Sequence, residues 1–590
     1  MKLSDYIIDF LAKKNVTHFF GMSGGAAVHL FDSVSKHKDT HYVCSQHEQS
    51  AAISADGYAR VTGKLGVAIT TSGPGATNLL TGVCCSYYDS IPTLMLTGQV
   101  SRQRLKKDLK VRQLGFQETD IVDIFRSVTK YSAQVLDPGS IRYHLEKAYY
   151  YAFEGRPGSV LLDIPDDLQR VEINPDELQG FSPDKIEYDF SKINVQIKEL
   201  LELIKLSKRP IIVLGGGLNT PRIDSKKLEN IINILKIPVL CSWAGVDTIE
   251  GENPYNIGTF GVYGPRFGNF AIQNSDLIIS LGCRLSQNLT GGILSSFATE
   301  ARIIMVDADK AELDKFDNRG IDIHHRIQSS LDLFINSLLP ELKDYAENFQ
   351  EWLTKVKFWK EKFPLTRQTI KTNNHVDAYE FVAKLSKYAS PGEKIFVDTG
   401  GNLTWTLNQW KVKKDQRIIS AWNNTPMGYS LPASIGAAFA NSQDSITCII
   451  GDGGLMICLS ELATLLKHKL NIKVFLFNNH SHGIQKQTLQ TWLNGNYVGV
   501  DPDSGLAFPD FKKVATAFDL QLFDIYNEDD LDQNLQEIYK IKGPVFCNVE
   551  INPDQKLYPV VKFGAALENQ LPQLDEEIIK SEMIVKPFNL

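Results

Sequence analysis

Residues 446–479 read ITCIIGDGGLMICLSELATLLKHKLNIKVFLFNN. Two apolar runs, at 446–450 and 473–477, are separated by a glycine-rich turn and a helical pattern. Continuous apolar runs that alternate with helices are typical of buried parallel strands. The stretch therefore predicts a strand–helix–strand unit of an α/β fold, with GDGG after the first strand and NN at the end of the second.

The turn after the first run has the chemistry of a diphosphate site. A glycine turn between a parallel strand and a helix directs backbone N–H groups outward, and the helix dipole favours negative charge. One carboxylate and one amide at neighbouring strand ends supply the hard oxygen ligands that Mg²⁺ prefers. We therefore predict diphosphate contacts at Gly451, Gly453 and Gly454, and a magnesium site at Asp452 and Asn479.

The same alternation of strands and helices recurs along the chain. Further apolar runs bounded by glycine, each followed by a helical pattern, lie at 17–21, 66–70, 211–215 and 277–282. A chain of this length, divided into domains of ordinary size, contains three domains. We predict three parallel-sheet domains of α/β class at residues 1–170, 190–345 and 375–558, followed by an irregular tail at 559–590. The predicted boundaries are the polar or charged stretches at 170–192 and 340–375.

The composition excludes several classes of protein. The chain has 590 residues, a net charge of −7 and 43% apolar residues, which argues against a surface for nucleic acid or anionic membrane. No run approaches the roughly 18 apolar residues of a membrane span, and the first residues lack the apolar core of a signal peptide. The eight cysteines show no C-x-x-C spacing. We expect a cytoplasmic protein with reduced cysteines.

A second group of polar residues lies near the N-terminus, where His47, Glu48 and Gln49 precede a helical stretch rich in small residues. A carboxylate at a helix N-terminus favours the helix dipole. A buried glutamic acid with a raised pKa is also suited to proton transfer. His47 is explained by packing or helix capping. Ala51 stands where an H-E-x-x-H zinc motif has its second histidine, so that zinc motif is excluded.

Ordered matches to one family extend over nearly the whole chain. Besides the motifs above, they lie at residues 20–26, 46–49, 56–60, 71–78, 89–92, 97–100, 116–118 and 426–429. On these residues, the chain resembles the thiamine-diphosphate-dependent enzymes, and within them the acetolactate (acetohydroxyacid) synthase catalytic subunit. The resemblance implies a pyrimidine-binding, a central Rossmann-like and a diphosphate-binding domain. It also implies thiamine diphosphate and Mg²⁺ as cofactors, and a homodimer or homotetramer with active sites at the interface.

The resemblance also assigns roles to individual residues. Glu48 becomes the acid that activates the aminopyrimidine, and Met427 the apolar wedge that bends the cofactor, with plain core filling as the alternative. The third metal ligand is the backbone carbonyl of Ser481. The remaining cofactor contacts are Gly24, Pro74, Asn78, Gly400, Gly401, Asn402 and Ile484. The substrate pocket is lined by Phe116, Gln117 and Thr488. The resemblance places Glu48, Gly25 and Gln117 in the catalytic set, and we add His482 because of its position beside the predicted metal ligands.

The chain departs from the synthase pattern in three places. An Arg-Phe-Asp-Asp-Arg run reads RLSQN at 284–288, so that Asn288 replaces its last arginine, and Thr488 replaces a tryptophan of the acceptor region. The Gly-Gln-His contact to the diphosphate reads GGN at 400–402, so that Asn402 replaces the histidine. His480 and His482, beside the metal ligands, are suited either to proton transfer with a carbonyl acceptor or to structural hydrogen bonds.

The expected reaction is decarboxylation of a 2-oxo acid, pyruvate, followed by transfer of the two-carbon unit to a carbonyl acceptor. Acetolactate synthesis is the leading interpretation. The changes at Asn288 and Thr488 leave open a transfer to a keto-sugar nucleotide in surface-polysaccharide biosynthesis, and a catalytically inactive homologue is the third alternative. The expected partners are these small molecules and further copies of the chain.

The middle domain leaves FAD binding open. Three glycines at 215–217 follow one predicted strand, and Asp307 and Asp309 follow another. In the synthases a domain of this design binds FAD, and the alternative is a nucleotide-type fold that serves only as a scaffold.

Overall fold

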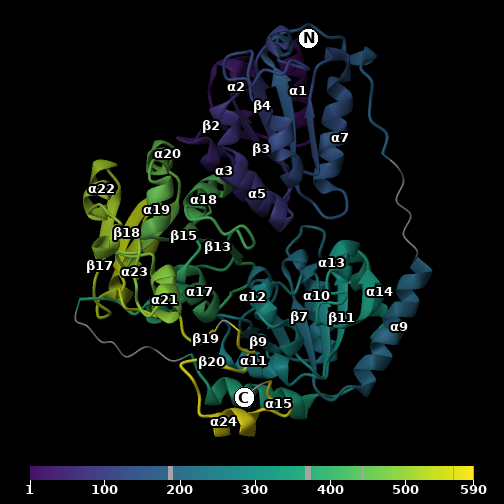
Figure 1. The fold of residues 1–590 in the computed structure, drawn as a ribbon, viewed down its shortest axis with the longest axis vertical. Helices are drawn as coiled ribbons and strands as arrows, with labels where there is room; N and C mark the ends of the chain where they lie inside the picture. Colours follow the sequence, from purple (N-terminus) through teal and green to yellow (C-terminus); the bar gives the residue numbers. More distant parts are fainter. Residues whose placement is uncertain (184–189, 366–373, 442–443, 563, 589–590) are drawn as a thin grey trace.

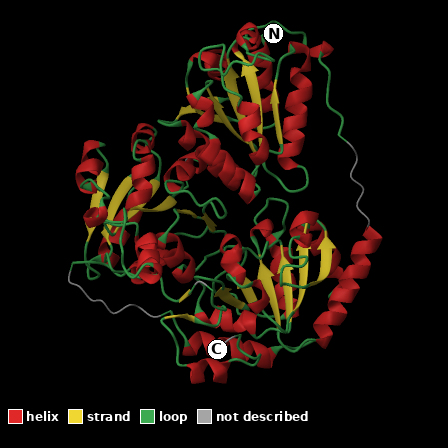
Figure 2. Ribbon diagram, viewed as in Figure 1, coloured by secondary structure: helices red, strands yellow, loops and turns green. Residues whose placement is uncertain are grey.

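The computed structural model describes residues 1–183, 190–365, 374–441, 444–562 and 564–588. Three six-stranded sheets, parallel throughout, are packed against helices and form three domains (Figure 1; Figure 2). The predicted α/β class with three parallel-sheet domains is confirmed. Residues 184–189 and 366–373, which fall within the predicted boundary stretches, and Phe563 of the tail lie outside the described residues.

The N-terminal sheet reverses its strand order between β1 and β3. The order is β2 (His41–Cys44), β1 (His18–Met22), β3 (Gly66–Thr70), β4 (Thr93–Gln99), β6 (Ser159–Pro165) and β5 (Tyr131–Gln134). In open parallel sheets, ligands bind at the carboxyl ends of the strands where the order reverses. Here that point lies between the residues that follow Met22 and those that follow Thr70.

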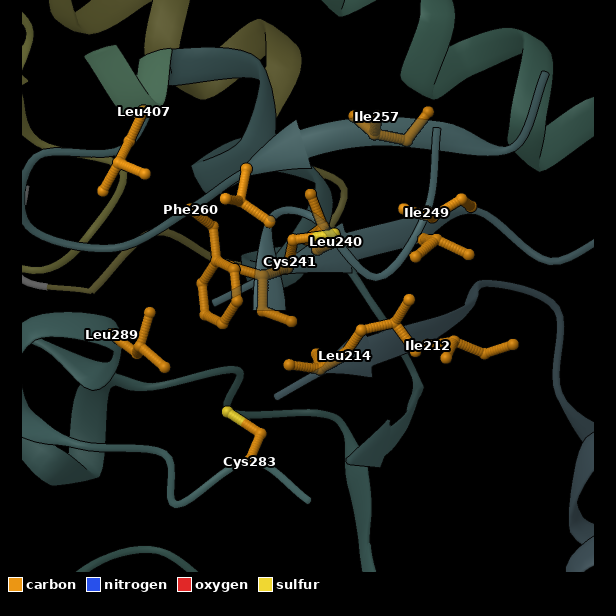
Figure 3. Close-up of a cluster of buried hydrophobic side chains, with 14 of the residues drawn as sticks. Ile212, Leu214, Leu240, Cys241, Ile249, Ile257, Phe260, Cys283, Leu289 and Leu407 are labelled. Carbon is orange, nitrogen blue, oxygen red and sulfur yellow. The ribbon is translucent and has the colours of Figure 1, made fainter. Parts of the chain in front are cut away.

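The middle sheet reverses its order between β10 and β7. The order is β12 (Ile323–Gln328), β11 (Arg302–Asp307), β10 (Leu277–Leu281), β7 (Pro210–Leu214), β8 (Val239–Cys241) and β9 (Asn256–Thr259). Figure 3 shows apolar side chains of β7 and β8, such as Leu214 and Leu240, in one buried cluster. Leu407 of helix α17 (Gly401–Gln409) belongs to the same cluster, so the middle and C-terminal domains share a core.

The C-terminal sheet reverses its order between β13 and β15. The order is β14 (Arg417–Ile419), β13 (Lys394–Val397), β15 (Ile446–Gly451), β16 (Ile472–Asn478), β18 (Val545–Glu550) and β17 (Gln521–Ile525). Helix α19 (Asp452–Cys458) begins where β15 ends, and α17 begins three residues after β13 in sequence. The strand–helix–strand unit expected at 446–479 is present, and its glycine turn lies at the reversal point.

Two helices join the N-terminal and C-terminal domains by direct backbone contact. Helix α3 (Glu48–Thr62) crosses α18 (Ser430–Ala438). A Cβ atom built on Gly57 would lie 2.1 Å from the carbonyl oxygen of Ala433, and one on Gly436 would lie 1.9 Å from that of Ser54. These distances are too short for any side chain, so the crossing requires glycine on both helices.

A buried polar network stabilises this crossing. Asp56, which has no exposed surface, accepts hydrogen bonds from Arg60 Nε (2.7 Å), Ser86 Oγ (2.9 Å) and Tyr429 Oη (2.5 Å). Arg60 Nη2 also donates to Asp89 Oδ2 at 2.8 Å. Because Tyr429 immediately precedes α18, the network fixes the start of that helix against α3.

The tail is more ordered than the sequence predicts. Strand β19 (Val560–Val561) pairs antiparallel with β20 (Gln570–Leu571), and helix α24 (Glu576–Glu582) lies beside α15 (Gln350–Lys362) of the middle domain (Figure 1). Glu582 bonds to Lys355 and Lys362 of α15. Within the described part of the chain, no helix is long and apolar enough to cross a membrane.

We expect Asp56→Ala to lower stability strongly, because it leaves the buried Arg60 with Asp89 as its one carboxylate partner and strands the Tyr429 hydroxyl. Removing one member of a buried ionic network costs about 3–5 kcal/mol. The melting temperature of the apoprotein should therefore fall by more than about 5 °C. Asp123→Ala is the matched control, since Asp123 pairs with Arg126 on the surface. Equal melting temperatures for the two variants would contradict the role of the network.

Candidate active site

The C-terminal domain forms a cradle at the reversal point of its sheet. Gly400 has φ +95°, and a Cβ atom built on Gly451 would lie 3.3 Å from Asn402 Oδ1. A Cβ on Gly453 would lie 2.5 Å from His482 Nε2. The predicted diphosphate residues after β13 and β15 are thus brought together, with glycine at the points of closest approach.

Three polar groups converge beside this cradle, namely the Asp452 carboxylate, the Asn479 amide and the Ser481 carbonyl. Asp452, 2% exposed, accepts N–H bonds from Gly453 (2.6 Å), Asn479 (3.2 Å) and Ser481 (3.2 Å). The amide of Asn479 reaches to 3.1 Å from Asp452 Oδ2 and 2.8 Å from the Ser481 carbonyl. The amide Nδ2 in this position donates to both acceptors. With the amide turned by 180°, its oxygen would join the other two in a set of the kind that Mg²⁺ prefers.

The charge of Asp452 also suits a cation. Burial raises the pKa of this carboxyl to about 7, against the opposing effect of its backbone hydrogen bonds. A metal ion bound there would favour the ionised form. Among the described residues, no group of three or more His, Cys, Asp or Glu side chains is placed to hold a metal ion. The candidate set here instead combines one carboxylate with an amide and a backbone carbonyl. The donor set fits Mg²⁺ completed by diphosphate oxygens and water.

Met427 and the two histidines take different places around the cradle. Met427 is half-exposed rather than part of the core, and its Cε lies 3.7 Å from a Cβ built on Gly453. His482 also faces Gly453, and burial lowers its pKa. His480 Nε2 lies 3.1 Å from Glu550 Oε2, and this hydrogen bond raises the histidine pKa. His480 thus has a structural partner, whereas His482 lies over the glycine turn.

Glu48 is held at the first residue of α3 in the N-terminal domain. Its side chain is half-buried, Oε2 accepts a hydrogen bond from Asn78 Nδ2 at 3.0 Å, and Oε1 lies 3.5 Å from a Cβ built on Gly75. His47 caps the helix, because its Nδ1 accepts the N–H of Gln49 at 3.1 Å. The capping interpretation of His47 is thereby confirmed. The side chain of Glu48, which is only half-buried, remains partly exposed.

The other predicted N-terminal residues surround the same reversal point. A Cβ built on Gly24 would lie 2.5 Å from Thr71 Cβ, whereas one on Gly25 meets nothing within 4 Å. Gln117, with φ +62°, packs against Gly73, and Pro74 is exposed at the start of α4 (Pro74–Thr77). Phe116 is 82% exposed.

Sequence reasoning missed two buried carboxylates that hold site loops. Glu118 accepts the N–H groups of Lys106, Leu114 and Gly115 and so closes the loop that presents Phe116. Asp398, after β13, accepts four hydrogen bonds from its surroundings. The only sequence signal was the place of Glu118 within the matched segment 116–118.

The site residues form two groups within one chain. Glu48, Gly25 and Gln117 lie in the N-terminal domain. The second group, which is Asp452, Asn479, Ser481 and the glycine turns beside them, lies in the C-terminal domain. Over the described ranges, no hydrogen bond or ion pair joins the two groups. They are called the N-terminal and C-terminal half-sites below.

A cavity of about 210 Å³ adjoins the C-terminal half-site. Ile484 and Thr488 of helix α21 (Gly483–Trp492) form one wall, Asn288 of the middle domain another, and Lys562 of the tail a third. Two of the three positions that depart from the synthase pattern, Asn288 and Thr488, therefore line one cavity. Ile484, predicted as a cofactor contact, and Thr488, predicted as a pocket residue, share that wall, whereas Phe116 and Gln117 do not line the cavity.

The middle domain does not present its glycine turn as a phosphate cradle. Gly215 N–H donates to the carbonyl of Leu281 at 2.9 Å, and Gly217 N–H to that of Gly282 at 3.1 Å. A Cβ on Gly215 would lie 2.1 Å from the Gly282 oxygen. Two of the N–H groups that a dinucleotide phosphate needs are bonded within the protein. The turn therefore does not fit such a phosphate.

Comparisons with known proteins agree with this division. Three family models of thiamine pyrophosphate enzymes match: the N-terminal TPP binding domain at residues 1–124, the central domain at 197–334 and the C-terminal TPP binding domain at 398–549. The acetolactate synthase large subunit of Cyanidium caldarium is 33% identical over 96% of both chains. The probable acetolactate synthase large subunit of Methanocaldococcus jannaschii is 31% identical over 100% of both. Acetolactate synthase 2, chloroplastic, of Nicotiana tabacum is 29% identical over 97% of this chain and 86% of its own.

Adjacent glycines of the N-terminal half-site should respond differently to alanine. Gly24→Ala should lower the melting temperature of the apoprotein, because its Cβ meets Thr71, whereas Gly25→Ala should leave it unchanged. If Gly25 faces the cofactor, as expected, thiamine diphosphate and Mg²⁺ should raise the melting temperature of Gly25→Ala less than that of the wild type. A loss of apoprotein stability in Gly25→Ala, equal to that in Gly24→Ala, would show that both are packing glycines.

Proposed function

The chain belongs to the thiamine pyrophosphate enzyme family, and on that premise we propose that it decarboxylates pyruvate and joins the two-carbon unit to a carbonyl acceptor, as an acetolactate synthase does. The observation that carries the proposal is the convergence of the Asp452 carboxylate, the Asn479 amide and the Ser481 carbonyl beside a glycine cradle. Full-length similarity to acetolactate synthase large subunits supports the choice of reaction.

The C-terminal half-site would bind the charged end of thiamine diphosphate. Asp452, Asn479 and the Ser481 carbonyl would hold Mg²⁺, and the turns that begin at Gly400 and Gly451 would accommodate the diphosphate. Met427, half-exposed beside Gly453, would press against the middle of the cofactor. When bound, the cofactor supplies a thiazolium carbon that adds to a 2-oxo group and takes up the electrons left by departing carbon dioxide.

The N-terminal half-site would manage the proton that starts this chemistry. Glu48 would hold a proton on the oxygen that faces away from Asn78 and exchange it with the aminopyrimidine. The bond from Asn78 Nδ2 fixes the other oxygen, and the helix start at Glu48 fixes the backbone. In a single chain the Glu48 side chain is only half-buried. Closure by a partner would bury it and favour its protonated form.

We propose that the partner is a second copy of the chain. The N-terminal half-site is flanked by exposed apolar side chains, Phe116 at 82% and Leu114 at 52%. The C-terminal half-site is flanked by Ile457 at 54% and Met456 at 41% exposed. Apolar side chains that rim a polar site are typical of an interaction surface. A two-fold dimer would place the N-terminal half-site of each subunit against the C-terminal half-site of the other.

Subunit mixing tests this arrangement and both half-sites at once. We expect Glu48→Gln and Asp452→Asn each to abolish activity alone. Coexpressed in equal amounts, they should recover about one quarter of wild-type activity, since half of the dimers are mixed and each mixed dimer has one intact site. Mixtures of Glu48→Gln with itself under a second tag serve as the control. An inactive mixture, with mixed dimers verified, would show that each site is built within one chain.

A second candidate concerns the acceptor. The cavity beside the C-terminal half-site is lined partly by apolar side chains such as Trp492, Leu557 and Val560. Its polar lining residues are Tyr263, Gln287, Asn288, Gln487, Thr488 and Thr491, with Lys562 as its cation and no Asp or Glu among them. Uncharged hydrogen-bonding groups suit a hydroxyl-rich carbonyl compound, and one lysine suits an attached phosphate. This lining favours a keto-sugar nucleotide as an alternative to a second 2-oxo acid.

The reaction is tested by incubating the protein with pyruvate, thiamine diphosphate and Mg²⁺ and identifying products by mass spectrometry. We expect acetolactate and carbon dioxide from pyruvate alone. Little acetolactate, together with a two-carbon-larger product when a keto-sugar nucleotide is added, would establish the second candidate. No carbon dioxide under either condition would contradict both and identify an inactive homologue, against which the retained Glu48, Asp452 and Asn479 argue.

A further inference from the structure

Asp398 is a buried carboxylate at the carboxyl end of β13, immediately before the glycine turn at Gly400. It is 1% exposed. Its Oδ1 accepts the N–H groups of Thr399 (3.0 Å) and Gly428 (3.1 Å), and Oδ2 accepts the N–H (3.0 Å) and Oγ–H (3.2 Å) of Ser430. Over the described ranges, it makes no ion pair. Four neutral donors thus take the place of a countercharge.

These bonds connect three segments of the C-terminal half-site. Gly428 and Ser430 carry the segment that contains Met427. A Cβ atom built on Gly454 of the diphosphate turn would lie 2.9 Å from Asp398 Oδ1, so that turn rests on the carboxylate. The backbone oxygen of Asp398 accepts Asn402 Nδ2 at 2.7 Å. Asp398 therefore contacts the segment that contains Met427, the turn after β15 and the turn after β13.

We propose that Asp398 is a positioning residue that sets Met427 and the glycine turns in their cofactor-binding arrangement before the cofactor arrives. This inference rests on the proposed function, since it assigns Asp398 to the same cofactor. Met427 lies between Pro426 and Gly428, and Gly428 has φ +80°, a conformation that the bond to Asp398 helps to hold. The side chain of Met427 is thereby presented to Gly453 rather than to the core.

A purely structural role would be shared by other buried carboxylates of the same strand. Glu393 provides the comparison, because it lies at the opposite end of β13, is 4% exposed, and accepts hydrogen bonds from Ser390 N–H (2.8 Å) and Thr447 Oγ (2.6 Å). Burial raises the pKa of both carboxyl groups. Glu393 is bonded away from the half-site, so its loss should loosen the domain without moving Met427.

The test compares full-length Asp398→Asn and Glu393→Gln with the wild type. In Asp398→Asn, the amide nitrogen must face N–H donors on one side, so the hydrogen bonds from those donors are lost. We expect amide exchange of residues 426–430 in the apoprotein, followed by mass spectrometry, to accelerate at least about tenfold. The dissociation constant for thiamine diphosphate with Mg²⁺, from calorimetric titration, should rise at least about tenfold. Glu393→Gln should leave both quantities near the wild-type values.

Ser430→Ala provides a second variant if Asp398→Asn does not fold. It removes the hydroxyl donor and keeps the N–H, so the same two quantities should change in the same direction by about threefold. Unchanged exchange and affinity in the folded variants, or equal changes in Glu393→Gln, would overturn the inference. A wild-type protein that does not bind thiamine diphosphate would instead overturn the proposed function, and the inference with it.

Discussion

The crossing of α3 and α18 is the constraint on which the two half-sites depend. Each helix begins at a functional segment, since Glu48 is the first residue of α3 and Met427 lies just before α18. The crossing point, at 54–57 on α3, lies about 9–14 Å along the helix axis from Glu48. Gly57 and Gly436 allow the backbones to touch there. The position of one helix therefore determines the position of both segments.

The network around Asp56 adds specificity to this contact. Burying an ion pair costs desolvation energy that an apolar pair would not cost. Its bonds are directional, however, and in the observed register the Tyr429 hydroxyl donates to Asp56 Oδ1 at 2.5 Å. Small side chains allow a close approach but do not choose among neighbouring registers. We infer that the glycines allow the two helices to approach closely, and that the polar network fixes the register in which they cross.

Two carboxylates of the C-terminal domain are similarly buried but have different neighbours and different proposed roles. Burial raises the pKa of Asp398 to about 6 and that of Asp452 to about 7. Asp398 is surrounded by hydrogen-bond donors, which stabilise its charge without a cation. Asp452 also accepts N–H bonds, but the Ser481 carbonyl and the Asn479 amide lie beside it. Oxygen atoms gathered in this way favour a bound cation, so the neighbours rather than the carboxylates differ.

The sequence predicted those residues whose partners are near in the chain or whose pattern belongs to strands and helices. Asp452 and Asn479 were found because they end adjacent strands of one repeating unit. Asp398 was missed because two of its partners are backbone N–H groups some thirty residues away, which any residue could supply. Glu118 was missed because its partners are also backbone N–H groups, which leave no side-chain pattern in the sequence even though they lie 3, 4 and 12 residues away. The order in the tail depends on ion pairs between Glu582 and α15, which no local pattern indicates.

The cavity beside α21 gives two of the departures from the synthase pattern, Asn288 and Thr488, a common location. Asn288 and Thr488 are 200 residues apart in sequence, yet they line one space together with Lys562 of the tail. Unrelated drift would scatter such changes over the surface. The residues proposed to hold the metal, Asp452, Asn479 and Ser481, follow the family pattern, and in the proposed reaction they belong to the steps that release carbon dioxide. Because the cavity walls come from three separate segments, they can change without moving these residues. Under the proposed function, this separation places a change of chemistry in the choice of acceptor.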